Sequence, residues 1–387
     1  MAFDTTGTYI QVTGATTAVP GAVVQSSIWN SIHTDLGGAL TQYMQEFIAQ
    51  PSNRNIIWMN GSFEIWQRTT GLSPVVNLTS PVISYTADRW YALIDVNEDS
   101  TINGVAGLVS QSNFAYRFRR NAGQTGTASS MLGFPFGQDE VIAMKGKNVT
   151  LSFLVKAGAN WSPASGTLTM FLFTGTGAGG AARRANVPYT GELTPISTTV
   201  NLTPGGPTIA VAVNSTITIP TNITQAELAF LWNPTGTAGA ADDFTIDDIQ
   251  LEVQNSPSTW IATAYDRIPF PQMLQGCKRH YQKTFDYAVF PGAGSGRGNA
   301  LSVIAGAASR TGIYWRYPVE VRGTGTIGLF NPDGGSANWQ NTVSGASSTS
   351  TVDTSTQDSK GVFILSATVT AIDQVLIIHA QQAAGIT

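Results

Sequence analysis

The stretch Leu168-Thr169-Met170-Phe171-Leu172-Phe173 alternates apolar residues with other side chains, and Leu151-Ser152-Phe153-Leu154-Val155 upstream repeats the pattern. A period of two is typical of a strand with one face in a core, because successive strand side chains point to opposite faces. Similar short runs, separated by Gly, Pro and Asn turns, continue to residue 267. The sequence therefore predicts an all-β chain whose central part is a β-sandwich of jelly-roll type.

The predicted strands share apolar and β-branched residues bounded by turn residues. In the central part they cover residues 149–155, 167–173, 209–213, 216–219, 226–232 and 244–253. The pattern restarts near Pro269, with strands predicted over 285–290, 301–305, 313–321, 326–330, 361–368 and 374–380. We expect a smaller C-terminal β-sandwich, joined to the first through a short helix that begins within residues 269–281.

Near the N-terminus, apolar residues recur at helical spacings of three and four, between a Ser26-Ser27 N-cap and Pro51. This stripe consists of Ile28, Ile32, Leu36, Leu40, Tyr43 and Phe47. Copies of the helix, a partner protein or the chain's own β-domain could bury the stripe, and the sequence leaves these alternatives open. We therefore divide the chain into an arm and anchor helix (1–51), a jelly roll (52–267) and a C-terminal β-sandwich (268–387).

The composition excludes several classes of protein. Charged residues make up only 11% of the chain and the formal net charge is −4, so we expect no nucleic-acid partner. The single cysteine, Cys277, excludes an internal disulfide. The most apolar stretch, 362–380, is interrupted by Asp373-Gln374, so we expect no membrane insertion. The start of the chain lacks the pattern of a secretory signal, so we expect a soluble protein made in a reducing cytoplasm.

Four segments carry a resemblance to a known family. Residues 60–68 read Asn-Gly-Ser-Phe-Glu-Ile-Trp-Gln-Arg and residues 85–90 read Tyr-Thr-Ala-Asp-Arg-Trp. Residues 244–252 read Phe-Thr-Ile-Asp-Asp-Ile-Gln-Leu-Glu and residues 277–283 read Cys-Lys-Arg-His-Tyr-Gln-Lys. The first and third resemble the terminal strands of a carbohydrate-binding-module-like, galactose-binding-like jelly roll. In this order, the four resemble fibre and spike subunits of tailed bacteriophages.

The resemblance implies a virion structural protein, assembled in the cytoplasm of the host bacterium. Its N-terminal region would attach to portal, adaptor, capsid or tail proteins, and its β-domains would adhere to host-surface glycans. It also implies a homotrimer, because phage fibres are commonly three-fold. Two alternatives remain. One is an architectural capsid-fibre, decoration or tail-joining protein without a ligand, and the other is a polysaccharide-degrading tailspike.

The resemblance also implies a structural calcium ion, because the first and last strands of such jelly rolls lie close together and each can supply a carboxylate. In this chain the candidate ligands are Glu64, Asp247 and Asp248. The alternative is that Asp247 and Asp248 lie at a solvent-facing strand end while Glu64 pairs with an arginine. We expect no other cofactor.

Glycan binding requires exposed aromatic faces with polar groups around them. The candidates are Trp161, Tyr189 and Tyr91, of which Trp161, in Ala159-Asn160-Trp161-Ser162-Pro163, is the best exposed candidate. Other tryptophans lie in apolar runs, where a core position is expected; these are Trp66, Trp90 and Trp232.

Catalysis by a glycosidase requires two carboxylates across a cleft. The acidic clusters Asp95, Glu98, Asp99 and Asp242-Asp243 lie in predicted turns, where such residues serve the backbone. Neither a GxSxG nor an HExxH pattern is found in the sequence, nor is the repeat of a β-helical depolymerase. We therefore expect no enzymatic activity, and a degrading tailspike would depend on Asp95, Glu98 or Asp99.

Overall fold

The computed structural model describes residues 2–3, 9–10, 55–69, 74–177, 183, 187–254, 262–293, 297–305, 311–334, 338–366 and 375–383. The chain divides into two compact units, Met1–Asn53 and Arg54–Thr387. In the first unit, β1 (Ala2–Phe3) pairs antiparallel with β2 (Tyr9–Ile10). The predicted anchor helix lies outside the described residues, and the three predicted domain boundaries stay predictions.

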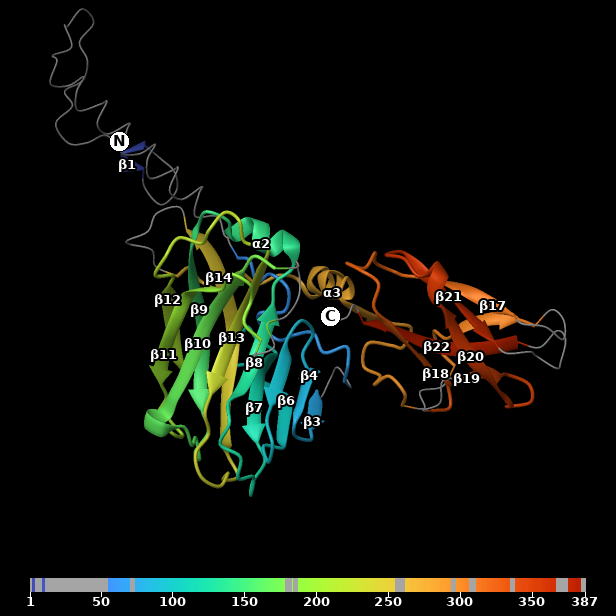
Figure 1. Cartoon of the computed structure of the whole chain (residues 1–387), viewed down its shortest axis with the longest axis horizontal. Coiled ribbons are helices and arrows are strands. Elements are labelled where there is room, and N and C mark those ends of the chain that lie inside the picture. The colour runs from blue at the N-terminus through green and yellow to red at the C-terminus, as the bar shows by residue number, and fades with distance from the viewer. Residues whose placement is uncertain are drawn as a thin grey trace, which may run out of the picture. The chain divides into compact units, whose positions relative to one another are not determined.

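Within residues 74–254, two six-stranded antiparallel sheets face each other (Figure 1). Sheet I has the order β11 (Leu193–Asn201), β10 (Thr167–Gly175), β13 (Gln225–Trp232), β8 (Ser130–Pro135), β5 (Tyr91–Ile94), β4 (Val82–Tyr85). Sheet II has the order β12 (Ile209–Asn214), β9 (Asn148–Ala157), β14 (Asp242–Gln254), β7 (Phe114–Arg120), β6 (Ser100–Ala106), β3 (Val75–Leu78).

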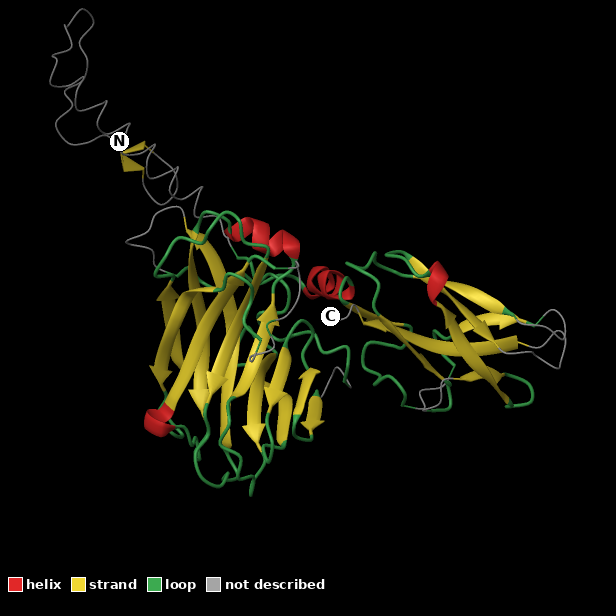
Figure 2. Ribbon diagram, in the orientation of Figure 1, coloured by secondary structure: helices red, strands yellow, loops and turns green. Residues whose placement is uncertain are grey.

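The two sheets enclose one hydrophobic core, as the alternation in the sequence predicts. From β10, Leu168, Met170 and Leu172 point into this core and are fully buried. Aromatic rings fill its centre, with Trp90 and Phe134 in contact at a centroid distance of 4.8 Å. The predicted fold class is therefore confirmed, and strands dominate the described residues (Figure 2).

Two α-helices occur in the described residues, and neither is long and apolar enough to cross a membrane. The sequence predicted α3 (Phe270–Lys278) but not α2 (Gln138–Met144), which lies at one end of the sandwich (Figure 1). Helix α2 packs Val141 and Met144 into the core. Its seven residues are too few to show a helical period. Two short 3₁₀ turns, η2 (Ala164–Gly166) and η3 (Thr354–Thr356), complete the helical elements described.

The C-terminal strands form an antiparallel sheet of eight strands within the described part of residues 281–383. Its path is β15 (Tyr281–Lys283), β22 (Val375–Ala383), β19 (Asn338–Asn341), β20 (Ser347–Asp353), β21 (Gly361–Ser366), β17 (Gly312–Arg316). Two more strands, β16 (Leu301–Ile304) and β18 (Thr326–Phe330), also pair with β22. These strands surround a second core, to which Trp315 and Trp339 contribute.

The segments at 60–68, 85–90 and 244–252 meet at one corner of the sandwich. The indole of Trp90 donates to the carbonyl of Asn60 at 2.9 Å, and the N–H of Ile249 donates to the carbonyl of Gly61 at 2.9 Å. Residues 60–62 and 67–68 form turns and residues 63–66 have no regular structure, so the strand that the resemblance implies is not formed there. The physical reason is the left-handed backbone of Asn60 (φ 64°) and Phe63 (φ 55°), which a strand does not accept.

The fourth segment, 277–283, packs against the same corner. The amine of Lys283 donates to the carbonyl of Gln67 at 2.7 Å, and a guanidinium nitrogen of Arg89 lies 2.6 Å from Nε2 of His280. Burial lowers the pKa of Lys283 to about 8. The second guanidinium nitrogen of Arg89 donates to the carbonyl of Pro135 at 3.0 Å, so Arg89 also joins this corner to β8. The segment at 60–68 therefore contacts each of the other three family-like segments.

Three of the predicted strands are wrong wholly or in part. Residues 216–219 and 285–290 have no strand structure, and β17 ends at Arg316 instead of continuing to residue 321. Pro318 explains the early end of β17, because proline has no N–H to donate to a neighbouring strand. Ile219 and Phe285 lie in loops, and their side chains are buried. Their apolar character therefore reflects core packing and not pairing between strands.

Candidate functional site

The outer face of sheet I carries a cluster of apolar side chains apart from the main core. Because Met170 and Leu172 point inward, Phe171 and Phe173 of β10 point outward. The same alternation brings residues of β4, β5, β8 and β13 to this surface. We call it the aromatic face, and it consists of Ile83, Tyr85, Tyr91, Leu93, Met131, Phe171, Phe173, Tyr189 and Ala229.

A buried pair of Tyr91 and Glu227 lies at the floor of the aromatic face. Both residues are fully buried, and the hydroxyl of Tyr91 donates to Oε1 of Glu227 at 2.6 Å. Burial, followed by the charge of Glu227, raises the pKa of the Tyr91 hydroxyl. The ring of Tyr91 lies over Gly133, where an added Cβ would come within 2.4 Å of it. Glycine at 133 therefore lets the ring lie flat on the sheet.

The segment before β11 covers one end of the aromatic face. The guanidinium of Arg183 lies 3.8 Å from the ring centroid of Phe173 and pairs with Glu192 at 2.6 Å. Tyr189 is 7% exposed, and its backbone N–H also donates to Glu192. The structure therefore brings the predicted residues Tyr91 and Tyr189 into one cluster, but both lie in its covered part.

The open part of the aromatic face lies around Phe171, which is half-buried. Ser197 of β11 is its direct cross-strand partner and is exposed. Thr169, two residues before Phe171 on the same face, is paired with the exposed Thr199. Tyr85 is half-buried at the other edge of the cluster. An accessible ring surrounded by hydroxyl groups suits the apolar face and the hydroxyls of a sugar.

Sequence reasoning missed Phe171, although the signal was present. In the alternating run 168–173, Leu168, Met170 and Leu172 occupy the core positions, so Phe171 necessarily belongs to the opposite face. An aromatic residue on the outer face of a sandwich strand is a candidate for stacking against a ligand. Phe173 follows on the same face and stacks on Phe171 at a centroid distance of 5.0 Å.

The prediction that Trp161 is exposed is wrong. Its side chain is 5% exposed, and its ring stacks on Trp232 at 4.8 Å with an interplanar angle of 14°. The indole N–H donates to the carbonyl of Gly166 at 2.9 Å. Trp161 therefore closes one end of the core, where an indole has both an apolar contact and a hydrogen-bond acceptor. Trp66, Trp90 and Trp232 lie in the core as predicted.

The candidate calcium ligands have other partners. Both oxygens of Glu64 accept from Asn113, at 2.9 Å from its backbone N–H and at 3.0 Å from its side-chain amide. Both oxygens of Asp248 accept from the guanidinium of Arg267, at 3.0 and 2.7 Å. Asp248 is 8% exposed and Asp247 is fully buried, so neither lies at a solvent-facing strand end. The arginine pairs with Asp248 and not with Glu64.

The third carboxylate is also saturated with donors. Asp247 accepts from the N–H of Leu108 at 2.9 Å, from Ser112 at 3.2 Å and from the N–H of Asp248 at 2.8 Å. Calcium requires several carboxylate and carbonyl oxygens directed at the ion. Among the described residues no group of three or more acidic, His or Cys side chains is arranged for a metal. The arrangement does not fit calcium, and the cation in contact with Asp248 is the guanidinium of Arg267.

Asp247 is expected to make the stability of the fold depend on pH. Burial, followed by the charge of Asp248, raises the pKa of Asp247 to about 7. A carboxyl with a raised pKa contributes stability that is complete below its unfolded pKa, near 4, and is lost as pH rises through 7. The difference in unfolding free energy between wild type and Asp247→Asn, measured by urea denaturation, should therefore be larger at acidic than at neutral pH, by roughly 3 kcal/mol. A pH-independent difference would contradict this assignment.

A polysaccharide-degrading enzyme would need Asp95, Glu98 or Asp99. In the structure these residues make hydrogen bonds that stabilise a turn. Glu98 is fully buried, and its Oε2 accepts from Ser130 at 2.8 Å and from the N–H of Asp95 at 3.1 Å. Burial raises the pKa of Glu98. Asp99 accepts from the N–H of Ser80 at 2.7 Å and from its hydroxyl at 2.8 Å. These contacts hold the backbone between β5 and β6.

No protein-family model and no curated protein matches the chain. Solved structures similar to it include the enzymatically active domain of tailspike protein 4 of bacteriophage CBA120, at 13% identity and a TM-score of 0.28, covering 52% of this chain and 21% of that chain. Another holds the CBM22-1 and GH10 modules of xylanase 10B from Clostridium thermocellum, at 13% identity and a TM-score of 0.29, covering 49% of this chain and 30% of that chain. A xylan-binding domain from CBM 22 is 12% identical with a TM-score of 0.27, covering 46% of this chain and 99% of that chain. The chain spans less than a third of the length of each of the first two of these structures.

Proposed function

We propose that the chain binds a glycan without covalent chemistry, through the open part of the aromatic face. The observation that carries this proposal is the half-buried ring of Phe171, with Ser197 beside it and Thr199 on the same edge strand. A pyranose presents an apolar face that stacks on such a ring and hydroxyls that reach the surrounding side chains. The hydrogen bond from Tyr91 to Glu227 fixes the ring of Tyr91 within the same face. Several subunits on one particle would add weak contacts by avidity.

Replacement of Phe171 by alanine is expected to weaken glycan binding by roughly five- to tenfold, since loss of one stacked ring removes about 1–1.4 kcal/mol. The measurement is binding of the purified full chain to an array of bacterial surface glycans. Tyr314→Ala is the matched control, because Tyr314 is an aromatic residue of β17 that is 41% exposed and lies outside the aromatic face. Failure of the wild type to bind any glycan, or equal binding by Phe171→Ala, would contradict the proposal.

We propose further that the chain is a fibre or spike subunit of a tailed-phage virion, attached through its N-terminal region and assembled as a homotrimer. Support comes from the four family-like segments, of which the segment at 60–68 contacts each of the other three at one corner. Peptides of this chain in purified particles, and a trimer mass in sedimentation, are the expected results. A non-degrading role predicts no release of reducing ends from host polysaccharide. Absence from particles would contradict the virion assignment.

A further inference from the structure

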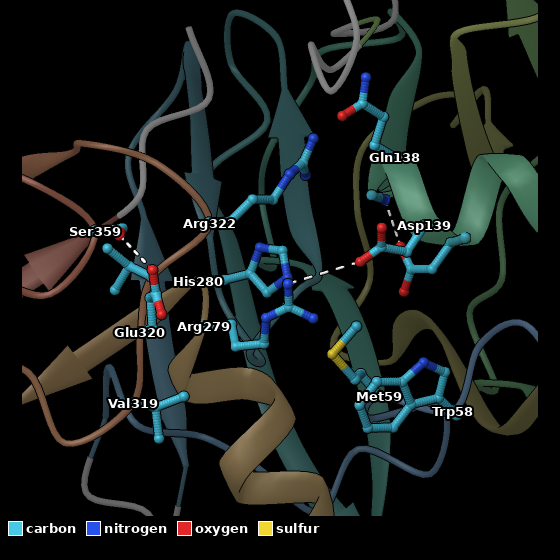
Figure 3. Close-up of a pocket in the computed structure, with 13 residues that line it drawn as sticks. Trp58, Met59, Gln138, Asp139, Arg279, His280, Val319, Glu320, Arg322 and Ser359 are labelled. Atoms are coloured by element: carbon cyan, nitrogen blue, oxygen red, sulfur yellow. Dashed lines mark hydrogen bonds and ion pairs between the residues drawn. The ribbon is translucent and has the colours of Figure 1, made fainter.

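A cavity of about 650 Å³ lies where the start of α2, the end of α3 and the loops at 319–322 and 359 converge. Figure 3 shows Arg279, His280 and Arg322 gathered in this cavity, with α2 and Asp139 beside them. We call it the arginine pocket and define it by Arg279, His280, Arg322 and Glu140. It shares no residue with the aromatic face.

Glu140 is neutralised from behind the pocket. Its Oε2 accepts from a guanidinium nitrogen of Arg89 at 2.7 Å, and both side chains are almost fully buried. The other terminal nitrogen of Arg89 lies 2.6 Å from Nε2 of His280. The positive charge of Arg89 therefore balances the negative charge of Glu140, the buried carboxylate of the pocket. Arg279 and Arg322 add two further positive charges to its lining.

The two remaining acidic groups of the lining compensate these arginines only weakly. Asp139 is 80% exposed and lies 3.6 Å from a nitrogen of Arg279, a distance and exposure typical of a weak surface pair. Glu320 is exposed and accepts from the hydroxyl of Ser359 at 2.5 Å, as Figure 3 shows. None of the ion pairs in the described part of the chain includes Arg322.

The positive charges around the pocket also affect the pKa of His280. Its pKa lies well below the usual value, first because of burial and then because of the charges of Arg89, Arg322 and Arg279. His280 is therefore neutral at physiological pH and adds no charge of its own. Clustered arginines around a concave site attract anions, and a planar guanidinium suits the two oxygens of a carboxylate.

A second feature of the pocket is an apolar side chain in its lining. Trp58 is half-buried and lines the same cavity as Arg279 and Arg322. An indole ring offers an apolar surface on which a sugar ring packs. Oε1 of Glu140 has no hydrogen-bond partner but is buried from solvent, so a ligand in the pocket does not reach it.

We propose that the arginine pocket binds an acidic saccharide. Its carboxylate accepts hydrogen bonds from Arg279 and Arg322, and its ring packs against Trp58. A neutral sugar would leave the arginines without an anion, and an inorganic anion would leave Trp58 without an apolar contact. The pocket therefore selects a ligand that carries both a carboxylate and a sugar ring. This proposal is independent of glycan stacking on the aromatic face.

The test is an NMR titration of the full chain with glucuronate and with its methyl ester, which has the same shape without the charge. Wild type should bind glucuronate at least roughly tenfold more tightly than the ester. The Arg322→Gln variant should bind glucuronate about tenfold more weakly than wild type does. Arg316→Gln, an exposed arginine of β17 outside the pocket, should bind like wild type. Arg322 is exposed, so its replacement should leave the fold intact.

Several results would overturn the proposal: no binding of glucuronate, equal binding of acid and ester, or normal binding by Arg322→Gln. Inorganic sulfate that binds as tightly as glucuronate would overturn the saccharide part, because the sugar ring would then contribute nothing. Phe171→Ala should leave glucuronate binding unchanged. Loss of glucuronate binding in that variant would place the ligand on the aromatic face and refute the pocket, while the function proposed for that face would survive.

Discussion

Replacement of Asp242 by alanine is expected to lower the free energy of unfolding by about 3–5 kcal/mol, because it removes one partner of a buried ion pair. Asp242 and Arg120 are completely buried and lie 2.8 Å apart, as direct cross-strand partners on β14 and β7. Arginine does not lose its proton in proteins, so a full positive charge would remain in the interior. The prediction that Asp242-Asp243 lies in a turn is wrong, because these residues begin β14.

The guanidinium of Arg120 would keep only neutral acceptors after this change. It donates to the carbonyls of Gly126 and Gly236, the latter at 3.1 Å, and these cannot balance its charge. Asp139→Ala is the matched control, since Asp139 is 80% exposed and should change stability by less than about 0.5 kcal/mol. Both variants are compared with wild type by urea denaturation. A loss below about 1 kcal/mol for Asp242→Ala would show that water reaches Arg120.

Much of the sandwich was predictable because its long strands carry the period of two. The runs at 149–155, 167–173 and 226–232 correspond to β9, β10 and β13, whose alternate residues fill the core. The strands β3 to β8 were not predicted. Strand β6 contains Asn103 and Gly104, residues of low strand propensity, and forms because β3 and β7 pair with it on either side. Tertiary pairing of this kind has no local signal.

The candidate site was only partly predictable for a similar reason. Tyr91 and Tyr189 were found by residue type, but their neighbour Glu227 was not, because its place depends on the order of strands in sheet I. The arginine pocket depends even more on long-range contacts. Arg89 and Glu140 are 51 positions apart, and Arg322 comes from the C-terminal part of the chain. Spacing along the sequence carries no information about such a cluster.

Replacement of Asn60 by alanine is expected to lower the free energy of unfolding by about 3 kcal/mol or more. Asn60 is fully buried, and its amide donates to the carbonyls of Ile65 and Asp88, each at 2.9 Å. Its Oδ1 accepts from the N–H of Ile65 at 2.8 Å. Alanine would leave the N–H of Ile65 and the carbonyl of Asp88 without these partners, whereas the carbonyl of Ile65 would keep the N–H of Asp88 at 3.0 Å. It would also place a β-carbon at φ 64° without the local hydrogen bonds that let asparagine adopt this conformation.

Two further variants separate the backbone effect from the hydrogen bonds. Asn60→Gly removes the same hydrogen bonds but accepts the left-handed backbone, so it should be more stable than Asn60→Ala by about 1 kcal/mol. Asn60→Asp keeps the size of the side chain but turns a carboxylate oxygen toward the carbonyls of Ile65 and Asp88, so it should be at least as unstable as Asn60→Ala. Urea denaturation measures all three. If Asn60→Asp were close to wild type, the amide donor would not hold this corner. The segment at 60–68 would then need a role other than joining the sandwich to its neighbouring segments, because the side chain of Asn60 would contribute little to stability.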